Sequence, residues 1–261
     1  MNEPSINKLN VLPPTLVAHR GYSGRYPENT LLSYKEAYKC GARFMEMDLQ
    51  LTRDCVPMLQ HDVSLLRMAG VDLDIREIKA QQVKKLRAVY QQRFGTVFLN
   101  NRFTSFKKFC KWLKGKPDVT VFVELKQESV DRFGVNTFVD QVGKRILKEG
   151  LETQCVVISF NQESIAYCRE RYSLPIAWVL PEWSDEKKQV LENLKPDYLF
   201  CNKNFLPTND VDIWQGSWQW AVYNLDTPES AIEMANRGIS WLETNEFGTL
   251  IKDPRLTGQQ T

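Results

Sequence analysis

A closed barrel of eight parallel strands alternating with helices, the (β/α)8 or TIM-type fold, is the fold class that this sequence predicts. Short apolar or β-branched runs alternate along the chain with segments of helical periodicity, a pattern typical of parallel βα units. Eight such runs occur, and a chain of 261 residues can bury one large core without dividing. We therefore expect residues 1–261 to form a single domain.

The expected strands are Leu16–Ala18, Arg43–Leu51, Val119–Lys126, Cys155–Phe160, Ile176–Leu180, Tyr198–Cys201, Trp218–Asn224 and Ser240–Asn245. The expected helices between them include Thr30–Cys40, Phe133–Lys148, Gln162–Arg171, Glu186–Leu194 and Pro228–Arg237. We assign Asn29 as the N-cap of the first helix, because an asparagine side chain accepts hydrogen bonds from free backbone amides there. Gly41 and Gly238 fall where two of these helices would end.

A ninth apolar run, Pro57–His61, does not fit the alternation. Only Thr52–Val56 separates it from the preceding strand, which is too short for a parallel crossover, so we expect an antiparallel hairpin. The hairpin would return His61 toward Leu51. A long insertion follows, from about residue 63 to residue 102. It either covers the barrel mouth and sorts substrates by size, or only shields the core.

Composition excludes several classes of protein. The 34 basic and 32 acidic residues nearly balance, so no strong field selects nucleic acid or an anionic membrane. No apolar run approaches the ~18 residues that a membrane-spanning helix needs. The six cysteines show no metal-binding spacing, and the first residues lack the apolar core of a signal peptide. We expect reduced thiols and a cytoplasmic protein.

The chain contains only two histidines, His19 and His61, and each closes a short apolar run. Histidine has the side-chain pKa nearest to neutrality, so two of them at strand ends suggest an acid and a base. The alternative is that both are structural residues.

Carboxylates interrupt two of the predicted strands. Glu46 and Asp48 are two residues apart and therefore point to one face of their strand, and Glu124 and Lys126 repeat this spacing. Buried carboxylates need a partner, and three acids at one barrel mouth form an oxygen-rich site suited to Mg²⁺ or Ca²⁺. Salt bridges from Arg20 and Lys126 are the alternative, and they do not account for the pair Glu46 and Asp48.

Six short motifs occur in order along the chain. They are HRG at His19–Gly21, PENT at Pro27–Thr30, EMDLQLT at Glu46–Thr52, HD at His61–Asp62, ELK at Glu124–Lys126 and SF at Ser159–Phe160. Together they resemble the glycerophosphodiester phosphodiesterase family, and the similarity extends from about Val17 to about Asn245. The resemblance implies a (β/α)8 barrel with a small insertion after the second histidine.

The resemblance also implies a set of site residues. A divalent cation, Mg²⁺ or Ca²⁺, would be held by Glu46, Asp48 and Glu124, with His19 and His61 as acid and base. This set suits a phosphodiester, whose hydrolysis requires charge neutralisation, a deprotonated nucleophile and a protonated leaving group.

Arg20 and Lys126 would hold phosphate oxygens. Family members are thought to use the neighbouring glycerol hydroxyl as nucleophile, forming a cyclic phosphate that water opens. The expected products are sn-glycerol 3-phosphate and an alcohol, from small glycerophosphodiesters such as those derived from phospholipid headgroups. The alternatives are a lysophospholipase D, which would need an apolar groove, and a barrel that binds phosphate ligands or partner proteins without catalysis.

The chain departs from the family pattern at three places. Cys55 stands where the family usually has a turn glycine, so the hairpin turn is expected to differ. The late TD motif appears as Thr244-Asn245, which removes a carboxylate, and the usual PTLEE segment is replaced by Phe103–Lys107.

Two further segments have alternative interpretations. The stretch WAVYN resembles the family's late WTVN, which makes Trp220 and Asn224 candidates for the pocket, but the alternation of Trp218, Trp220 and Val222 also fits a strand that buries one face. The basic amphipathic stretch from residue 106 to residue 116 could be a membrane-surface helix. We interpret it as a barrel helix with a solvated lysine face.

Overall fold

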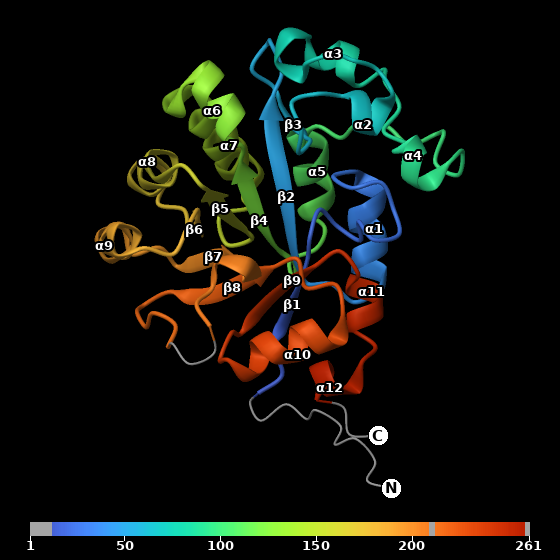
Figure 1. The fold of residues 1–261 in the computed structure, drawn as a ribbon. Coiled ribbons are helices and arrows are strands. Elements are labelled where there is room, and N and C mark those ends of the chain that lie inside the picture. Colours follow the sequence, from blue (N-terminus) through green and yellow to red (C-terminus); the bar gives the residue numbers. More distant parts are fainter. Residues whose placement is uncertain (1–11, 209–211, 259–261) are drawn as a thin grey trace, which may run out of the picture.

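Eight parallel strands close into a barrel, and a ninth, antiparallel strand extends it (Figure 1). The computed structural model describes residues 12–208 and 212–258. The strands are β1 (Thr15–Ala18), β2 (Phe44–Leu51), β3 (Pro57–Leu59), β4 (Thr120–Leu125), β5 (Cys155–Ser159), β6 (Ile176–Leu180), β7 (Tyr198–Asn202), β8 (Gln219–Tyr223) and β9 (Trp241–Thr244). The sheet order is β1-β9-β8-β7-β6-β5-β4-β2-β3, and pairing of β1 with β2 closes the ring. The predicted (β/α)8 fold is confirmed.

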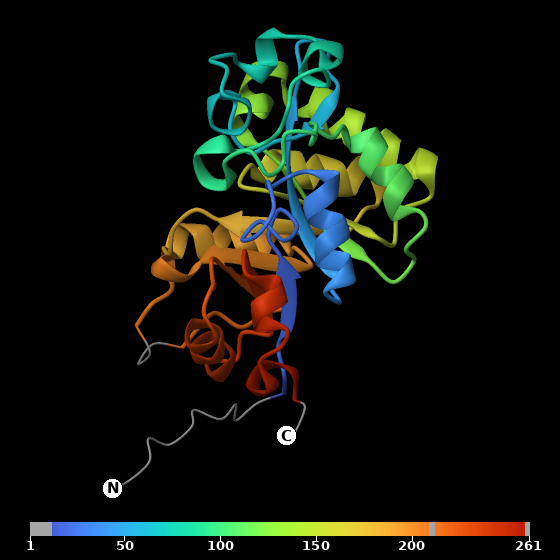
Figure 2. The ribbon, with the colours of Figure 1, turned by 90° about the vertical axis from the view of Figure 1, so that its right-hand side faces the viewer.

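Helices surround the ring of strands (Figures 1 and 2). They are α1 (Leu31–Lys39), α5 (Phe106–Leu113), α6 (Gln127–Phe133), α7 (Val135–Glu149), α8 (Gln162–Tyr172), α9 (Asp185–Leu194), α10 (Pro228–Asn236), α11 (Phe247–Leu250) and α12 (Pro254–Thr257). The basic stretch forms α5, which buries Phe106, Phe109, Cys110 and Leu113, as expected of a barrel helix. Across the described ranges, no helix is both long and apolar enough to cross a membrane.

The N-cap of α1 is Thr30, so the prediction of Asn29 as the cap was wrong by one residue. The Thr30 hydroxyl accepts a hydrogen bond from the Ser33 amide at 3.3 Å. Asn29 instead lies in the turn before the helix, with a positive φ of 54° that asparagine tolerates better than most residues. This turn frees the Asn29 side chain to point toward the barrel.

Both faces of the barrel strands are buried, in two separate layers. In β2, Met45, Met47 and Leu49 face the surrounding helices and belong to the large outer core. Phe44 packs on the smaller core inside the barrel, which contains Val17, Phe122, Val156, Ile158, Ala177, Val179, Phe200, Ala221 and Trp241. The strand period of two therefore carries Glu46 and Asp48 inward above Phe44. The barrel interior is therefore apolar toward the N-terminal ends of the strands and acidic toward their C-terminal ends.

Tryptophan side chains cover the barrel between β7 and β8, where the described residues form only the short turn η2 (Lys203–Phe205). Trp183 stacks on Trp214 with ring centroids 3.9 Å apart, and Trp220 lies 5.9 Å from Trp183. The Trp220 indole donates a hydrogen bond to the Trp214 carbonyl at 2.7 Å. Trp220 thus faces the outer core, which places it away from the pocket for which the sequence made it a candidate.

The insertion after His61 lies beyond the end of β2 (Figures 1 and 2). It contains α2 (Leu66–Ala69), η1 (Ile75–Glu77), α3 (Ala80–Val83) and α4 (Gln91–Phe94). Its apolar side chains form a small core with Met58 of β3 and Phe103. The expected hairpin is confirmed by the antiparallel pairing of β2 with β3. In its turn, Cys55 has a positive φ of 54°, the backbone region that favours glycine.

Candidate active site

A cavity of about 200 Å³ opens at the C-terminal ends of the strands, where barrel enzymes carry their active sites. The predicted site residues that line it are His19, Arg20, Glu46, His61, Glu124, Lys126 and Asn224. Asp48 is fully buried and in ionic contact with two of them, Arg20 and Lys126. Apolar side chains also line the cavity, among them Phe160 of the SF motif, which is 37% exposed. The structure therefore brings together all the predicted site residues except Trp220.

The HRG motif forms a tight turn after β1. Arg20 has a φ of 55° and Gly21 a φ of 80°. A side chain at Gly21 would place its Cβ 2.5 Å from the Ser33 hydroxyl oxygen, so this position requires glycine. The turn also directs the Arg20 backbone amide to the Glu46 carboxylate, which accepts its hydrogen bond at 3.1 Å.

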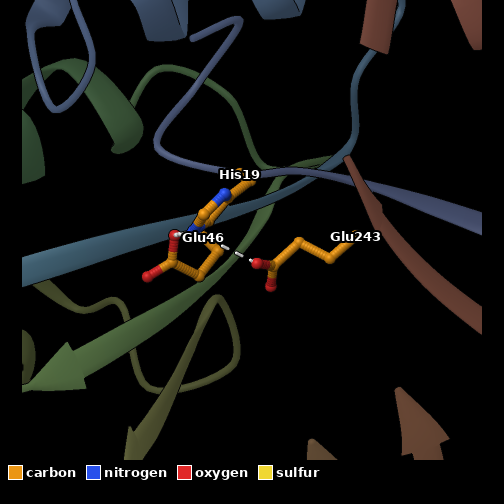
Figure 3. A group of neighbouring side chains, drawn as sticks. All are labelled: His19, Glu46 and Glu243. Carbon is orange, nitrogen blue, oxygen red and sulfur yellow. Dashed lines mark ion pairs between the residues drawn. The ribbon is translucent and has the colours of Figure 1, made fainter. Parts of the chain in front are cut away.

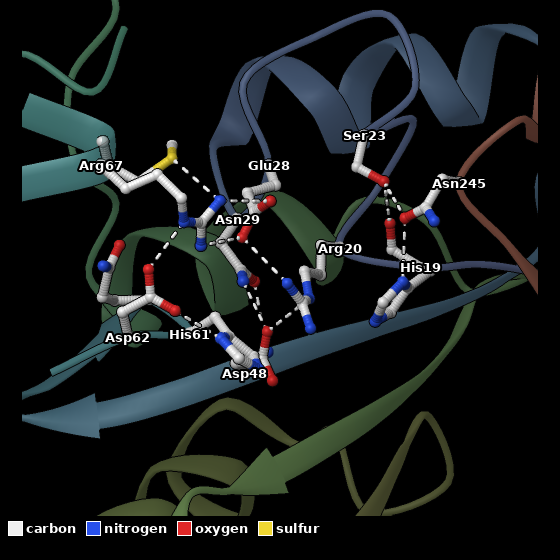
Figure 4. Close-up of polar contacts among 12 residues, drawn as sticks. His19, Arg20, Ser23, Glu28, Asn29, Asp48, His61, Asp62, Arg67 and Asn245 are labelled. Carbon is white, nitrogen blue, oxygen red and sulfur yellow. Dashed lines mark hydrogen bonds and ion pairs between the residues drawn. The ribbon is translucent and has the colours of Figure 1, made fainter. Parts of the chain in front are cut away.

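Three adjacent residues of the PENT motif, Glu28, Asn29 and Thr30, have three different structural roles. Glu28 is buried and forms an ion pair with Arg20 at 3.0 Å. Asn29 donates to Asp48 Oδ2 at 2.7 Å through its amide, and its amide oxygen accepts from the Asp48 backbone at 3.2 Å (Figure 4). The third residue, Thr30, is the helix cap. The motif thus fixes the orientation of Asp48.

Cations contact two of the three predicted metal ligands. Asp48 lies between Arg20 Nε at 2.9 Å and Lys126 Nζ at 3.6 Å, and Glu124 lies 3.0 Å from Lys126 Nζ. Glu46 has no such cationic partner among the described ion pairs, apart from His19 at 3.8 Å. The salt-bridge alternative therefore accounts for Asp48 and Glu124 and leaves Glu46 unexplained.

The acids of this site differ in their pKa values because their neighbours differ. Burial raises the pKa of Glu46 well above its usual value, and the nearby Asp48 carboxylate adds to the effect. Burial acts the same way on Asp48, but Arg20 and Lys126 outweigh it and hold its pKa well below the usual range. Burial also raises the pKa of Glu124, against the opposing effect of Lys126. Without another cation, Glu46 therefore holds a proton more readily than Asp48 does.

The residues present fit a divalent cation. One oxygen each from Glu46, Asp48 and Glu124 lies within 4.8 Å of the others. Glu46 Oε1 and Asp48 Oδ1 are buried and have no hydrogen-bond partner, although buried carboxylate oxygens normally do. An all-oxygen donor set of this kind suits a hard ion such as Mg²⁺ or Ca²⁺.

His19 is oriented by Asn245, the residue that replaces the family's aspartate. Asn245 donates through its amide group to Asp226 Oδ2 at 2.9 Å, so its amide oxygen faces His19 Nδ1 at 2.9 Å. That oxygen can only accept, hence Nδ1 carries the proton in the neutral ring and Nε2 carries the lone pair. Burial lowers the pKa of His19 to about 3, and the Arg20 cation acts in the same direction.

His61 is oriented by a second chain of contacts, which begins in the insertion. Asp62 Oδ1 accepts from His61 Nδ1 at 2.6 Å, and Asp62 Oδ2 accepts from Arg67 Nε at 2.7 Å. Two further Arg67 nitrogens hold the Glu28 carboxylate at 2.8 and 2.9 Å. The His61 carbonyl accepts from the buried Gln50 side chain at 2.9 Å. Within the described part of the chain, the insertion reaches the site through Arg67 and contributes no residue to the cavity lining.

Sequence reasoning missed three residues of the site. Glu243 of β9 lines the cavity, and Arg67 and Asp226 orient the residues that hold the two histidines. Glu243 left a signal, because it interrupts the apolar strand Trp241–Thr244 as Glu46 interrupts β2. Arg67 and Asp226 lie in segments without regular periodicity, and only the fold shows their partners.

Comparisons with known proteins identify the family of this chain. The model of the glycerophosphoryl diester phosphodiesterase family matches residues 19–249. A glycerophosphodiester phosphodiesterase of Caldanaerobacter subterraneus subsp. tengcongensis is 25% identical over 249 residues, covering 93% of this chain and 98% of that protein. Another from Bacillus subtilis is 29% identical over 231 residues, covering 76% of this chain and 74% of the relative.

Solved structures show the same fold. An Oleispira antarctica phosphodiesterase, solved in complex with the product sn-glycerol-3-phosphate, superposes with a TM-score of 0.81 at 20% identity and covers 91% of this chain and 95% of its own. The glycerophosphodiester phosphodiesterase of Thermotoga maritima gives a TM-score of 0.71 at 20% identity, with 93% of this chain and 99% of its own covered.

Proposed function

Since this chain belongs to the glycerophosphoryl diester phosphodiesterase family and is a phosphodiesterase of that class, we propose the residues and steps by which it hydrolyses glycerophosphodiesters. One observation carries the proposal. Two histidines, three oxygen ligands and two cations meet around one cavity at the C-terminal ends of the barrel strands. This is the set of groups that cleavage of a phosphodiester requires.

The cation would be held by Glu46, Asp48 and Glu124, with Mg²⁺ or Ca²⁺ favoured by the all-oxygen donor set. When bound, it neutralises charge on the non-bridging phosphate oxygens. Lys126 and Arg20 line the same cavity and supply further positive charge toward the phosphate. The neighbouring carboxylates hold the pKa values of both cations above their usual ranges, against the effect of burial, so both stay charged at neutral pH.

His19 and His61 move the protons. Each ring donates its Nδ1 proton to an oriented acceptor, Asn245 or Asp62, which leaves the neutral ring with its lone pair at Nε2. One histidine begins as the neutral ring and takes the proton of the attacking glycerol hydroxyl at Nε2. The other begins protonated at both ring nitrogens and gives its Nε2 proton to the departing alcohol oxygen. A cyclic glycerol phosphate forms, and water opens it with the two histidines in exchanged roles. The products are sn-glycerol 3-phosphate and an alcohol.

Release of glycerol phosphate from a panel of headgroup diesters and a lysophospholipid tests this proposal. We expect turnover of small glycerophosphodiesters that a chelator abolishes and Mg²⁺ or Ca²⁺ restores. Glu124→Gln should mimic chelation, whereas Asp131→Asn, at an exposed residue outside the cavity, should leave the rate unchanged. Full activity of a chelated, metal-free sample would refute the metal requirement. Preference for lysolipid would favour a lysophospholipase D, and no turnover at all would favour a phosphate-binding barrel.

We also propose a cytoplasmic location. All six cysteines are free, four of them buried, and burial raises the pKa of Cys110, Cys155, Cys168 and Cys201. Such thiols are expected in a reducing compartment. Fractionation of cells that produce the protein would test the location, and recovery from the medium or the periplasm would contradict it.

A further inference from the structure

Glu243 is a buried carboxylate that the proposed reaction does not use. It projects from β9 into the barrel and is only 3% exposed. Its Oε1 atom lies 3.4 Å from His19 Nε2 (Figure 3), whereas Asn245 contacts the other ring nitrogen, Nδ1. Glu46 Oε2 approaches the same nitrogen at 3.8 Å.

When the ring is neutral and both carboxyls are ionised, these three atoms are all hydrogen-bond acceptors. The orientation of Asn245, fixed by Asp226, places the ring proton on Nδ1, so Nε2 presents a lone pair to the two carboxylates. Ligand atoms from His19, Glu46 and Glu243 all lie within 4.8 Å of one another. In addition, the buried Glu46 Oε1 has no hydrogen-bond partner. Lone pairs that converge in a buried site need a proton or a cation between them.

We infer that His19, Glu46 and Glu243 form a second divalent-cation site, which takes ions that accept a nitrogen ligand, Zn²⁺ above all. Imidazole and carboxylate are established zinc ligands, whereas Mg²⁺ and Ca²⁺ prefer oxygen alone. Ligands about 2.0–2.1 Å from a tetrahedral zinc ion lie about 3.3 Å from one another, close to the separation of His19 and Glu243. Glu46 belongs to both acidic groups and would be shared between them.

Zinc at this site inhibits the enzyme. Bound to Nε2, the ion occupies the lone pair through which His19 exchanges protons, and this consequence rests on the proposed function. The three ligands also line the substrate cavity, so an ion there changes the charge that the phosphate meets. Mg²⁺ or Ca²⁺ held by Glu46, Asp48 and Glu124 does not relieve the inhibition by itself, because that ion does not use His19 as a ligand.

The two histidines of the chain allow a direct binding test. The full chain, labelled with ¹⁵N-histidine and saturated with Mg²⁺, is titrated with Zn²⁺ while the ring nitrogens are followed by NMR. We expect the Nε2 signal of His19 to shift with one zinc ion bound per chain, and the His61 signals to stay in place. Glu243→Gln should weaken zinc affinity at least about tenfold. Glu246→Gln, at a carboxylate that faces Arg25 at 3.8 Å, should keep the wild-type affinity.

Absence of a His19 shift, a shift of His61 instead, or wild-type zinc affinity in Glu243→Gln would overturn the site. Circular dichroism confirms that both variants are folded. A parallel assay measures zinc inhibition of each protein relative to its own zinc-free rate, and Glu243→Gln should require at least about ten times more zinc. Zinc that shifts the His19 signal without slowing the reaction would support the site and contradict the catalytic role of His19. The NMR result therefore stands even if the proposed activity fails.

Discussion

Replacing Arg67 with methionine removes the guanidinium through which the insertion holds Glu28 and Asp62. Methionine keeps most of the aliphatic stem of arginine, so the main change is the loss of charge and hydrogen bonds. The substitution removes three Arg67 nitrogens that donate to carboxylates. Two of them contact Glu28, and one contacts Asp62. Glu28, which is 8% exposed, would keep only the ion pair with Arg20.

The size of the effect on stability follows from burial. Removing one partner of a buried ion pair costs about 3–5 kcal/mol. The side chains of Arg67 and Asp62 are 26% and 32% exposed, so solvent screens part of that interaction, and we expect a loss of about 2–3 kcal/mol. For a chain of this size the melting temperature should fall by about 4–12 °C.

The pH dependence of this loss has a definite sign. Hydrogen bonding to His61 and Arg67 holds the pKa of Asp62 below its usual value, against the effect of burial, and Arg67 and Arg20 do the same for the buried Glu28. Carboxylates with a depressed pKa in the folded state contribute stability above their unfolded pKa and lose it as pH falls. The stability gap between wild type and Arg67→Met should therefore be largest above about pH 4–5 and shrink in more acidic solution.

Activity should fall as well, because Asp62 would lose the contact that holds it against His61. A small displacement of a catalytic group commonly reduces the rate about 10²-fold, so we expect kcat/KM to drop by about 10–100-fold. Arg76→Met is the matched control, since Arg76 holds Asp74 within the same insertion at 2.6 Å. It should lower the melting temperature but not kcat/KM. Wild-type kcat/KM in folded Arg67→Met would refute the proposed link to His61.

Three further predictions follow from the site and the hairpin turn. Lys126→Met should lower kcat/KM by about 10²–10³-fold, because a charge aimed at the transition state is lost, and an unchanged value would make Lys126 a structural partner of the acids. His19→Ala and His61→Ala should each slow the reaction about 10²–10⁴-fold. The rate loss of the double variant should be far smaller than the product of the two single losses. The bell-shaped pH profile of kcat/KM should lose one limb in a single variant that retains activity. A near-normal rate in either single variant would assign that histidine a structural role. Cys55→Gly should stabilise the fold by about 1 kcal/mol, because the φ of 54° is strained for cysteine, and a lower melting temperature would contradict this.

The barrel could be predicted from sequence because its signal is local. Alternating runs identify the strands, and the period of two shows that Glu46 and Asp48 share a face whatever the fold. The same rule fails for Trp220, because strands of a parallel barrel are buried on both faces and alternation does not say which face is inside. Trp220 pairs in register with Leu199 of β7, and both face the outer helices.

Other parts of the site depend on contacts between distant segments. Thr30 and Asn29 are both good cap residues, and the choice between them follows from the bond of Asn29 to Asp48, 19 positions away. Arg67 and Glu28 are 39 positions apart, and His19 and Asn245 are 226 apart. No periodicity reports such pairs, so a single sequence shows the residue types of the site but not the partners that orient them.

The charges around the cavity explain why binding of a cation is coupled to the release of protons from the buried carboxylates. Four buried or nearly buried carboxylates, from Glu46, Asp48, Glu124 and Glu243, face two lysine or arginine cations among the described residues, Arg20 and Lys126. Burial raises the pKa values of Glu46 and Glu243 well above the usual range, so without a metal ion these two groups hold protons more readily than exposed glutamates do. A divalent cation can replace those protons, and its affinity must rise with pH because its ligands have to be deprotonated. One such ion makes the group of four carboxylates and two cations neutral, which removes the repulsion that a phosphodiester would otherwise meet. Buried carboxylates are unfavourable without cations, so we expect the pocket to bind a cation first and the anionic phosphodiester second.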